Sequence, residues 1–285
     1  MSASVIIQSR FPRITRRVRR FSTSIDDLGK QAVFYGKAIG CIPRALIHYR
    51  TETIRLIAEI SMGSGALAVI GGTVVIVGFL TLFSGGTIAV QGYSSLGNIG
   101  VEALTGFFAA FLNVRIAAPV ISGIGLAATI GAGSTAQLGA MRVAEEIDAL
   151  ESMAIRPMTY LVGTRVLAGM IAIIPLYALA VIASFIASRF ATVVIYGQSA
   201  GVYDHYFSTF LIPSDILWSF AQAIVMALAV MMIHTYYGYN AAGGPVGVGV
   251  AVGNAVRTSL IAVVTVTLLI SLAVYGTSGN FNLSG

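Results

Sequence analysis

Five long stretches that contain no Asp, Glu, Lys or Arg constrain this chain most. They are Gly63–Phe83, Ile116–Met141, Val166–Ser188, Ile216–Tyr239 and Thr258–Thr277. Each is long enough for a helix to cross a hydrocarbon core, which needs about 20 apolar residues. The chain is 56% hydrophobic and 10% charged, whereas soluble domains are roughly 25% charged. The sequence therefore predicts an all-α integral membrane protein with five transmembrane helices.

A sixth apolar segment, Ala103–Val114, precedes the second stretch and is separated from it by Arg115. Together, residues 103–141 would measure roughly 58 Å as one helix, at 1.5 Å per residue. Because that is too long for one crossing, we expect a kink or break near Pro119 and a part that does not span.

The distribution of cations predicts the orientation. Eleven of the 17 Lys and Arg residues lie within residues 1–60, so the positive-inside rule places the N-terminus in the cytoplasm. Five crossings of the cell membrane then place the C-terminus outside. Residues 142–165 and 240–257 become inner segments, and residues 84–100 and 189–215 become outer loops. Because the basic segment leads directly into the spans, it indicates contact with a membrane surface rather than with nucleic acid.

Residues 22–60 mix cations with apolar side chains. The apolar members are Val33, Ile39, Ile42, Leu46, Ile54 and Ile57, and the cations are Lys30, Lys37, Arg44, Arg50 and Arg55. This pattern predicts an amphipathic helix that lies along the inner leaflet and is interrupted at Pro43. A small cytoplasmic subdomain is the alternative. We divide the chain into this N-terminal region, residues 1–60, and a five-span membrane domain, residues 61–285.

Four of the eleven acidic residues fall within seven positions of one inner segment. On a helix over residues 142–153, apolar and acidic side chains would form neighbouring stripes, and Pro157 marks a boundary after it. Such a helix is suited to a groove on another protein, although an ordinary solvated loop helix is the alternative. We assign to this predicted docking helix Arg142, Glu145, Glu146, Ile147, Asp148, Leu150, Glu151 and Met153.

The run from Gly139 to Pro157, GAMRVAEEIDALESMAIRP, resembles the signature of the YrbE/MlaE permease family. These proteins are the membrane subunits of ABC transporters that work with MCE-domain proteins. The Arg-rich N-terminal extension is similar to that of the actinobacterial Mce branch. Further matches to the family are Gln91, Gly92, Tyr93, Arg115, Pro119, Arg165, Gly238, Tyr239 and Asn240.

The resemblance implies a fold and a set of partners. The implied fold is an N-terminal interfacial helix and five transmembrane helices, with a cytoplasmic coupling helix between spans two and three. Two permeases would pair, each docked through its coupling helix on one subunit of an ABC ATPase dimer, which binds the ATP and Mg²⁺. The MCE proteins would lie outside, and the cargo would be a lipid of the fatty acid or sterol class, taken up by the cell. This chain itself would need no cofactor.

The sequence also departs from the family pattern. Residues 128–137 lack an arginine that many members carry, Gln137 replaces an acid, and Ile116 stands where an acid often follows the arginine. We interpret these losses as a sign of an asymmetric pair, in which this chain is the YrbE B-type subunit beside a non-identical permease.

Other polar residues have less specific patterns. The Gly-rich run that begins at Gly131 lacks the Gly-Lys-Ser/Thr ending of a phosphate loop, so it favours close helix packing. The three histidines show no metal-ligand spacing, and we assign no catalytic residue, although a Ser134–His234 dyad is conceivable. Glu102 and Arg115 are candidates for an ion pair or for the lining of a polar path. Residues Gly243–Gly253 are expected to form a flexible turn.

Two other classes of function remain open. A secondary transporter or channel for an apolar solute predicts ionisable residues within the spans for ion coupling. An integral membrane enzyme predicts convergent His, Asp, Glu or Ser side chains near one face. Both signals are almost missing from this sequence, whereas a permease with a separate ATPase needs a docking helix and no nucleotide motif of its own. The lining of the substrate path is not identified by the sequence.

Overall fold

The computed structural model describes residues 12–62 and 66–275, with side chains for residues 29–57 and 72–274. Arg10, residues 63–65 and the last ten residues lie outside this range. The described residues form helices and no strands. Five of the segments are long and apolar enough to cross a membrane, namely residues 72–97, 102–143, 158–195, 213–239 and 244–274. The prediction of an all-α fold with five spans is confirmed.

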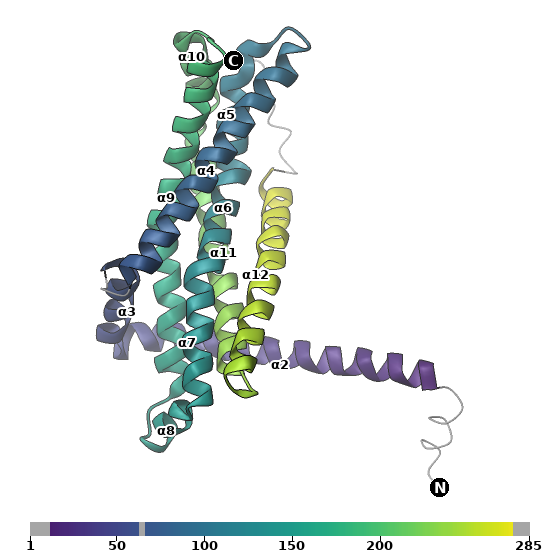
Figure 1. Ribbon diagram of the computed structural model, residues 1–285, viewed down its shortest axis with the longest axis vertical. Coiled ribbons are helices and arrows are strands. Elements are labelled where there is room, and N and C mark those ends of the chain that lie inside the picture. Colours follow the sequence, from purple (N-terminus) through teal and green to yellow (C-terminus); the bar gives the residue numbers. More distant parts are fainter. Residues whose placement is uncertain (1–11, 63–65, 276–285) are drawn as a thin grey trace.

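The spans form an elongated bundle, and a further long helix lies across it (Figure 1). Span one is α4 (Ala66–Gly97), span four is α11 (Pro213–Tyr239) and span five is α12 (Gly244–Tyr275). The connection between spans four and five contains only a few residues, and both Gly243 and Gly244 adopt positive φ angles, 91° and 71°. A left-handed backbone is cheap for glycine, so this pair allows a tight turn.

Span two is one continuous helical run from Glu102 to Val143. Its pieces are η1 (Glu102–Leu104), α5 (Thr105–Leu112), η2 (Asn113–Ala117), α6 (Ala118–Leu126), η3 (Ala127–Gly131) and α7 (Ala132–Val143). The expected break at Pro119 is therefore absent. The expected part that does not span stays a prediction, because 42 helical residues exceed the roughly 30 Å of a hydrocarbon core. The wide π-helical turn η2 directly precedes Pro119, and such a turn relieves the clash between a proline ring and the preceding carbonyls without ending the helix.

Span three consists of η4 (Met158–Gly163), α9 (Thr164–Phe190) and η5 (Ala191–Ile195). The short helix α10 (Ala200–Phe210) follows and lies beside α5 at one end of the bundle (Figure 1). Aromatic pairs hold α10 in place. The rings of Phe107 on α5 and Phe210 lie 4.7 Å apart, and those of Phe185 on α9 and Phe207 lie 4.8 Å apart.

Two predicted loops are parts of spans. Helix α4 continues through most of the predicted outer loop to Gly97, and α12 begins at Gly244, so the predicted flexible turn at Gly243–Gly253 is helix. The glycine content suggested a turn, but glycine is also frequent in transmembrane helices, where neighbouring helices support the backbone. Arg257 accordingly lies within α12 and not in an inner loop.

The helix across the bundle is α2 (Pro12–His48), and α3 (Arg50–Met62) follows it. The chain stays helical through Pro43 and bends at Tyr49 instead, so the predicted interruption at Pro43 is wrong. Phe34, Ala38 and Ala45 form the buried face of α2. Their spacing of four and seven residues places them on one stripe, which packs against the spans.

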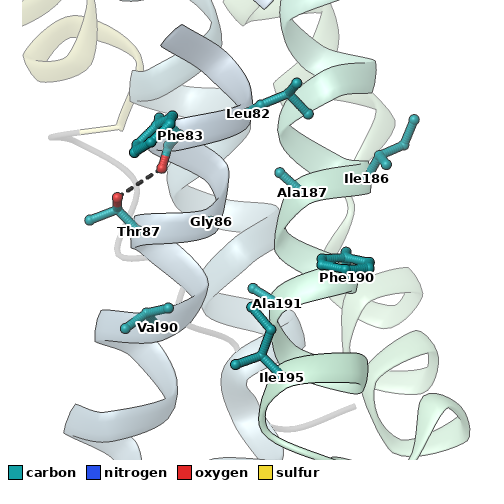
Figure 2. Close-up of a pocket in the computed structure, with 10 residues that line it drawn as sticks. All are labelled: Leu82, Phe83, Gly86, Thr87, Val90, Ile186, Ala187, Phe190, Ala191 and Ile195. Carbon is teal, nitrogen blue, oxygen red and sulfur yellow. Dashed lines mark hydrogen bonds between the residues drawn. The ribbon is translucent and has the colours of Figure 1, made fainter. Parts of the chain in front are cut away.

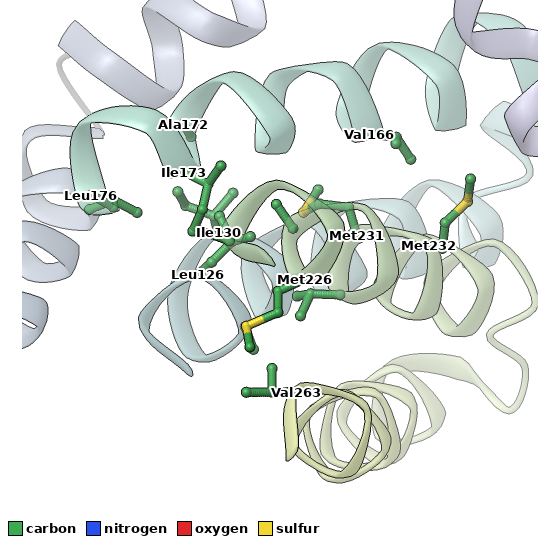
Figure 3. Close-up of a cluster of buried hydrophobic side chains, with 14 of the residues drawn as sticks. Leu126, Ile130, Val166, Ala172, Ile173, Leu176, Met226, Met231, Met232 and Val263 are labelled. Atoms are coloured by element: carbon green, nitrogen blue, oxygen red, sulfur yellow. The ribbon is translucent and has the colours of Figure 1, made fainter. Parts of the chain in front are cut away.

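The apolar core lies where span two meets spans three and four. Figure 3 shows Leu126 and Ile130 from span two, Ile173 from α9 and Met226 from α11 pointing toward one another, with Val263 of α12 beside them. Small residues allow this close packing. A Cβ atom at Gly123 would lie 3.1 Å from the sulfur of Met226, which is the approach expected of glycine at membrane helix interfaces.

Candidate functional site

The acidic segment between spans two and three forms a turn and a short helix that project from one end of the bundle (Figure 1). Helix α7 ends at Val143, Glu145 takes a left-handed conformation with φ 59°, and α8 (Glu146–Ser152) follows. The predicted single helix over residues 142–153 is therefore shorter, because Arg142 belongs to α7 and Glu145 forms the bend.

The apolar side chains of α8 face the protein itself. Ile147 is 1% exposed and packs with Leu138 of α7 and Leu161 of η4, and Leu150 is partly buried beside them. The sequence predicted that this stripe would contact a partner, but it anchors α8 to spans two and three. Met153, by contrast, is 67% exposed.

The acidic side chains of this segment face outward. Glu145, Glu146 and Glu151 are exposed, and Asp148 accepts a hydrogen bond of 2.7 Å from the Arg142 guanidinium. Acids in the first turn of a helix are favourable there, because they interact with the exposed amide groups and the helix dipole. The result is an anionic surface on a rigidly anchored support.

Two residues matched to the family signature support this end of the bundle from inside. The buried Arg165 of α9 donates to the carbonyl of Leu161 at 3.2 Å, and its guanidinium lies 3.9 Å from the sulfur of Met141. Gly238 of α11 approaches α7 so closely that a Cβ would lie 2.9 Å from the Thr135 carbonyl oxygen. Span three and span four are thus held against the helix that carries α8.

Tyr239 and Asn240 complete this group at the end of span four. Tyr239 packs against the Leu138 and Ile147 cluster, and its ring lies 5.8 Å from that of Phe34 on α2. The Asn240 amide donates a hydrogen bond of 2.8 Å to the Tyr236 carbonyl. The structure therefore brings Arg165, Tyr239 and the acidic segment together.

The other signature residues lie in different places. The ring of Tyr93 stacks on that of Tyr196 at 4.4 Å, and Gly92 leaves room for Phe108, whose ring a Cβ would meet at 2.6 Å. Gln91 is exposed on α4. Gly92 and Tyr93 therefore join span one to α5 and to the chain after span three, at the end of the bundle opposite α8 (Figure 1).

Arg115 forms an ion pair that the sequence did not reveal. Its guanidinium donates to the carboxylate of Asp215 on α11 at 2.7 Å and lies 4.1 Å above the ring of Phe111. The candidate pair with Glu102 is wrong, since the Glu102 side chain is exposed and Arg115 is bound elsewhere. The two partners are 100 positions apart, so no spacing rule could find them. Pro119 is buried one turn beyond Arg115.

His234 of span four is buried against spans two and five. The sequence did not reveal that it joins these helices. Its Nδ1 lies 2.8 Å from the hydroxyl of Thr135 on α7, and its Nε2 lies 3.2 Å from the hydroxyl of Ser259 on α12. The conceivable Ser134–His234 dyad is not formed, because Thr135, next to Ser134, makes the hydrogen bond to the imidazole. Within residues 12–62 and 66–275, no three His, Cys, Asp or Glu side chains are grouped as a metal site requires.

An apolar cavity of about 530 Å³ lies between span one and span three. Figure 2 shows Phe83 and Val90 of α4 on one side and Phe190 of α9 and Ile195 of η5 on the other. The Thr87 hydroxyl donates to the Phe83 carbonyl at 2.8 Å, so it presents no free donor to the cavity. Its walls are suited to a hydrocarbon chain rather than to a polar solute.

Comparisons with known proteins agree with this architecture. The family model described as Permease MlaE matches residues 62–273. A probable ABC transporter permease protein of Rickettsia felis is 28% identical over 256 residues, which cover 86% of this chain and 95% of that protein. The chloroplastic protein trigalactosyldiacylglycerol 1 of Arabidopsis thaliana is 27% identical over 173 residues, 61% of this chain and 49% of that protein. A probable ABC transporter permease protein of Synechocystis is 25% identical over 181 residues, 64% of this chain and 69% of that protein.

Proposed function

Because this chain belongs to the MlaE permease family and is the permease subunit of an ABC transporter, with the ATPase on a separate partner, we propose that it moves a lipid of the fatty acid or sterol class. The direction we propose is uptake across the cell membrane. In this proposal the chain is a B-type subunit of the actinobacterial Mce branch. It pairs with a second, non-identical permease and works with MCE-domain proteins on the outer side.

The observation that carries the proposal is the anchored anionic surface of α8. Its acids Glu145, Glu146 and Glu151 face outward, whereas Ile147 ties the helix to spans two and three. A push from a bound ATPase on this surface would reach both spans, since packed helices move as bodies rather than deform continuously. ATP and Mg²⁺ bind the ATPase dimer, and this chain supplies the mechanical connection.

The cargo assignment is supported by the apolar character of the spans. The cavity between α4 and α9 is lined by hydrocarbon side chains (Figure 2). One relative, the Arabidopsis protein, carries the name of a galactolipid. The Arg115–Asp215 pair inside the described spans is internally neutralised. A path for an apolar molecule needs no further charge, because uncompensated charge in the membrane is costly.

The orientation is supported by the charges. The basic α2 and the loops at the α8 end would face the cytoplasm, following the positive-inside rule. The ATPase dimer would then dock at α8, and the MCE-domain proteins would meet the end that carries α10. A secondary transporter or channel is disfavoured, because the relatives over nearly the whole chain carry the name of ABC transporter permeases.

The docking proposal is tested by charge reversal. The triple variant Glu145→Lys, Glu146→Lys, Glu151→Lys leaves the Asp148–Arg142 pair and the Ile147 anchor in place. We expect it to lose at least about tenfold in ATPase association, since each interfacial charge contributes roughly 1 kcal/mol or more when reversed. Recovery of the ATPase on the tagged permease, measured by quantitative mass spectrometry, reports the loss.

Glu102→Lys is the control, because this exposed acid lies at the opposite end of span two. It should leave the recovery of the ATPase unchanged. Normal association of the triple variant would show that α8 is an ordinary solvated helix and not the docking site.

A further inference from the structure

Span four buries a polar side chain that no hydrogen bond supports. Gln222 of α11 is fully buried and lies more than two helical turns from either end of the helix. Among the residues that the structure describes, neither its amide nitrogen nor its amide oxygen has a hydrogen-bond partner. A buried amide without a partner is destabilising, and a hydrocarbon core supplies no water to it. In this arrangement of the helices, Gln222 therefore weakens the fold.

Gln222 faces the middle of span two. The Ser219 hydroxyl, three residues before Gln222, donates to the Val114 carbonyl of η2 at 2.5 Å. Four residues after Gln222, the side chain of Met226 lies against Gly123 of α6 (Figure 3). Residues spaced by three and four lie on one face of a helix. Gln222 is therefore directed at the part of span two between Val114 and Gly123.

Pro119 interrupts the hydrogen bonds of this part of span two. A proline has no N–H, so one carbonyl of the preceding turn lacks its donor within the helix. In the π-helical turn η2, the Ala118 N–H donates to the Asn113 carbonyl, five positions back. By the same spacing, Val114 is the acceptor that Pro119 leaves without a donor. The Ser219 hydroxyl of span four replaces this donor.

The segment that follows Pro119 has a π-helical turn at each end. Helix α6 is preceded by η2 and followed by η3. A π-helical turn contains more residues than an α-helical turn and is frequent at functional sites. Because the two kinds of turn interconvert without ending the helix, α6 can shift along span four while the ends of span two stay in place.

We propose that span two has a second register against span four, in which the Gln222 amide donates to the Val114 carbonyl in place of the Ser219 hydroxyl. Gln222 lies about 4.5 Å further along α11 than Ser219, and its side chain is longer. A shift of η2 and α6 toward the α8 end by less than one helical turn, about 5.4 Å, brings donor and acceptor together. Gln222 is unpaired in the register described here and paired in the other, so it lowers the free energy difference between them.

The second register is a property of this chain. Its role in transport rests on the docking of an ATPase at α8 that is proposed above, because a push at α8 would move span two between two end states. The test uses the purified full chain without an ATPase. Its failure would therefore leave the docking proposal standing.

The first variant is Gln222→Met, which keeps a similar shape and removes the amide. It should raise the Tm of the purified chain in detergent by about 2–4 °C, since the described register no longer contains an unpaired amide. The matched control is Gln137→Met, which makes the same change at an exposed position of α7. This control should change the Tm by less than about 1 °C.

Ser219→Ala tests the exchange of donors, because it removes the hydroxyl that pairs with Val114 in the described register. In the Gln222→Met background it should lower the Tm by about 4 °C, since the carbonyl then stays unpaired in both registers. In the wild-type background the loss should be about half as large or smaller, because Gln222 takes over the carbonyl. Hydrogen–deuterium exchange in residues 113–131, measured relative to residues 132–143, should be at least about fivefold faster in Ser219→Ala than in Gln222→Met.

Three outcomes would overturn the proposal. A lower Tm for Gln222→Met would show that the amide is already paired in the described register, for example through a buried water. Equal losses from Ser219→Ala in the two backgrounds would show that Gln222 does not replace Ser219. An equal gain in Tm for Gln137→Met would assign the effect of Gln222→Met to hydrophobicity alone.

Discussion

Two Arg–Asp pairs near the α10 end of the molecule have similar geometry and different surroundings. In the Arg115–Asp215 pair, the guanidinium nitrogen lies 2.7 Å from the carboxylate oxygen, and the side chains are 15% and 17% exposed. In the Arg189–Asp204 pair, the guanidinium nitrogen lies 2.9 Å from the carboxylate oxygen, but the side chains are 52% and 51% exposed. The hydrogen bond from Arg189 lowers the pKa of Asp204, so whatever this pair contributes is present at neutral pH and is lost as the pH falls through that lowered pKa.

Asp215→Asn should destabilise the protein far more than Asp204→Asn. Removing one partner of this largely buried pair leaves an uncompensated charge, which costs up to roughly 3 kcal/mol, whereas an exposed pair contributes about 1 kcal/mol or less. Thermal unfolding of the two variants in the same detergent measures the difference. Equal changes in Tm would contradict the role assigned to the Arg115–Asp215 pair.

Two groups of residues illustrate which features a sequence can reveal. The acidic cluster that includes Glu146 and Glu151 is local, so the segment was recognisable from composition alone. The contact of His234 with Thr135 joins positions 99 apart, and its existence depends on how two helices pack. Pairwise contacts across the bundle therefore had to come from the structure.

At the level of helices, span two packs closely on α11 at Gly131, the last residue of η3. A Cβ at Gly131 would lie 2.6 Å from the ring of His234, whereas a Cβ at Gly133 would meet nothing within 4 Å. Gly131 and Gly133 are two positions apart in the same helical run of span two and face different ways. They therefore separate the role of glycine in helix packing from its effect on the helix backbone.

Gly131→Ala should lower the stability by about 1–3 kcal/mol, because the added methyl group forces the helices apart or displaces the His234 ring. Gly133→Ala should be neutral or stabilising by up to about 1 kcal/mol, since alanine favours helix more than glycine. Thermal unfolding in detergent compares them. A larger loss for Gly133→Ala would contradict the described packing of α7 on α11.

Helix existence could be predicted, but helix ends could not. All five spans follow from the length of the uncharged stretches. Helix boundaries were misplaced where local signals compete with packing. Pro43 lies inside α2, and all of the Gly243–Gly253 run after Gly243 lies inside α12. In a membrane, every backbone group needs an internal partner, so a helix continues through residues that would end it in water.

At the scale of the whole molecule, the chain presents different chemistry at its two ends. One end carries the anionic surface of α8 and the basic helix α2, and the other carries α10 packed on α5 (Figure 1). Ile147 and Arg165 connect the first end to the spans. This arrangement fits a permease that receives force at one end and transmits it along continuous helices such as span two.

The most direct test of this account is affinity purification of the tagged chain from its native membrane in a gentle detergent, followed by quantitative mass spectrometry. The account predicts that an ABC ATPase is recovered in an amount comparable to the chain, together with a second permease and MCE-domain proteins. Recovery of the chain without any ATPase, under conditions that keep other ABC transporters intact, would contradict the central claim.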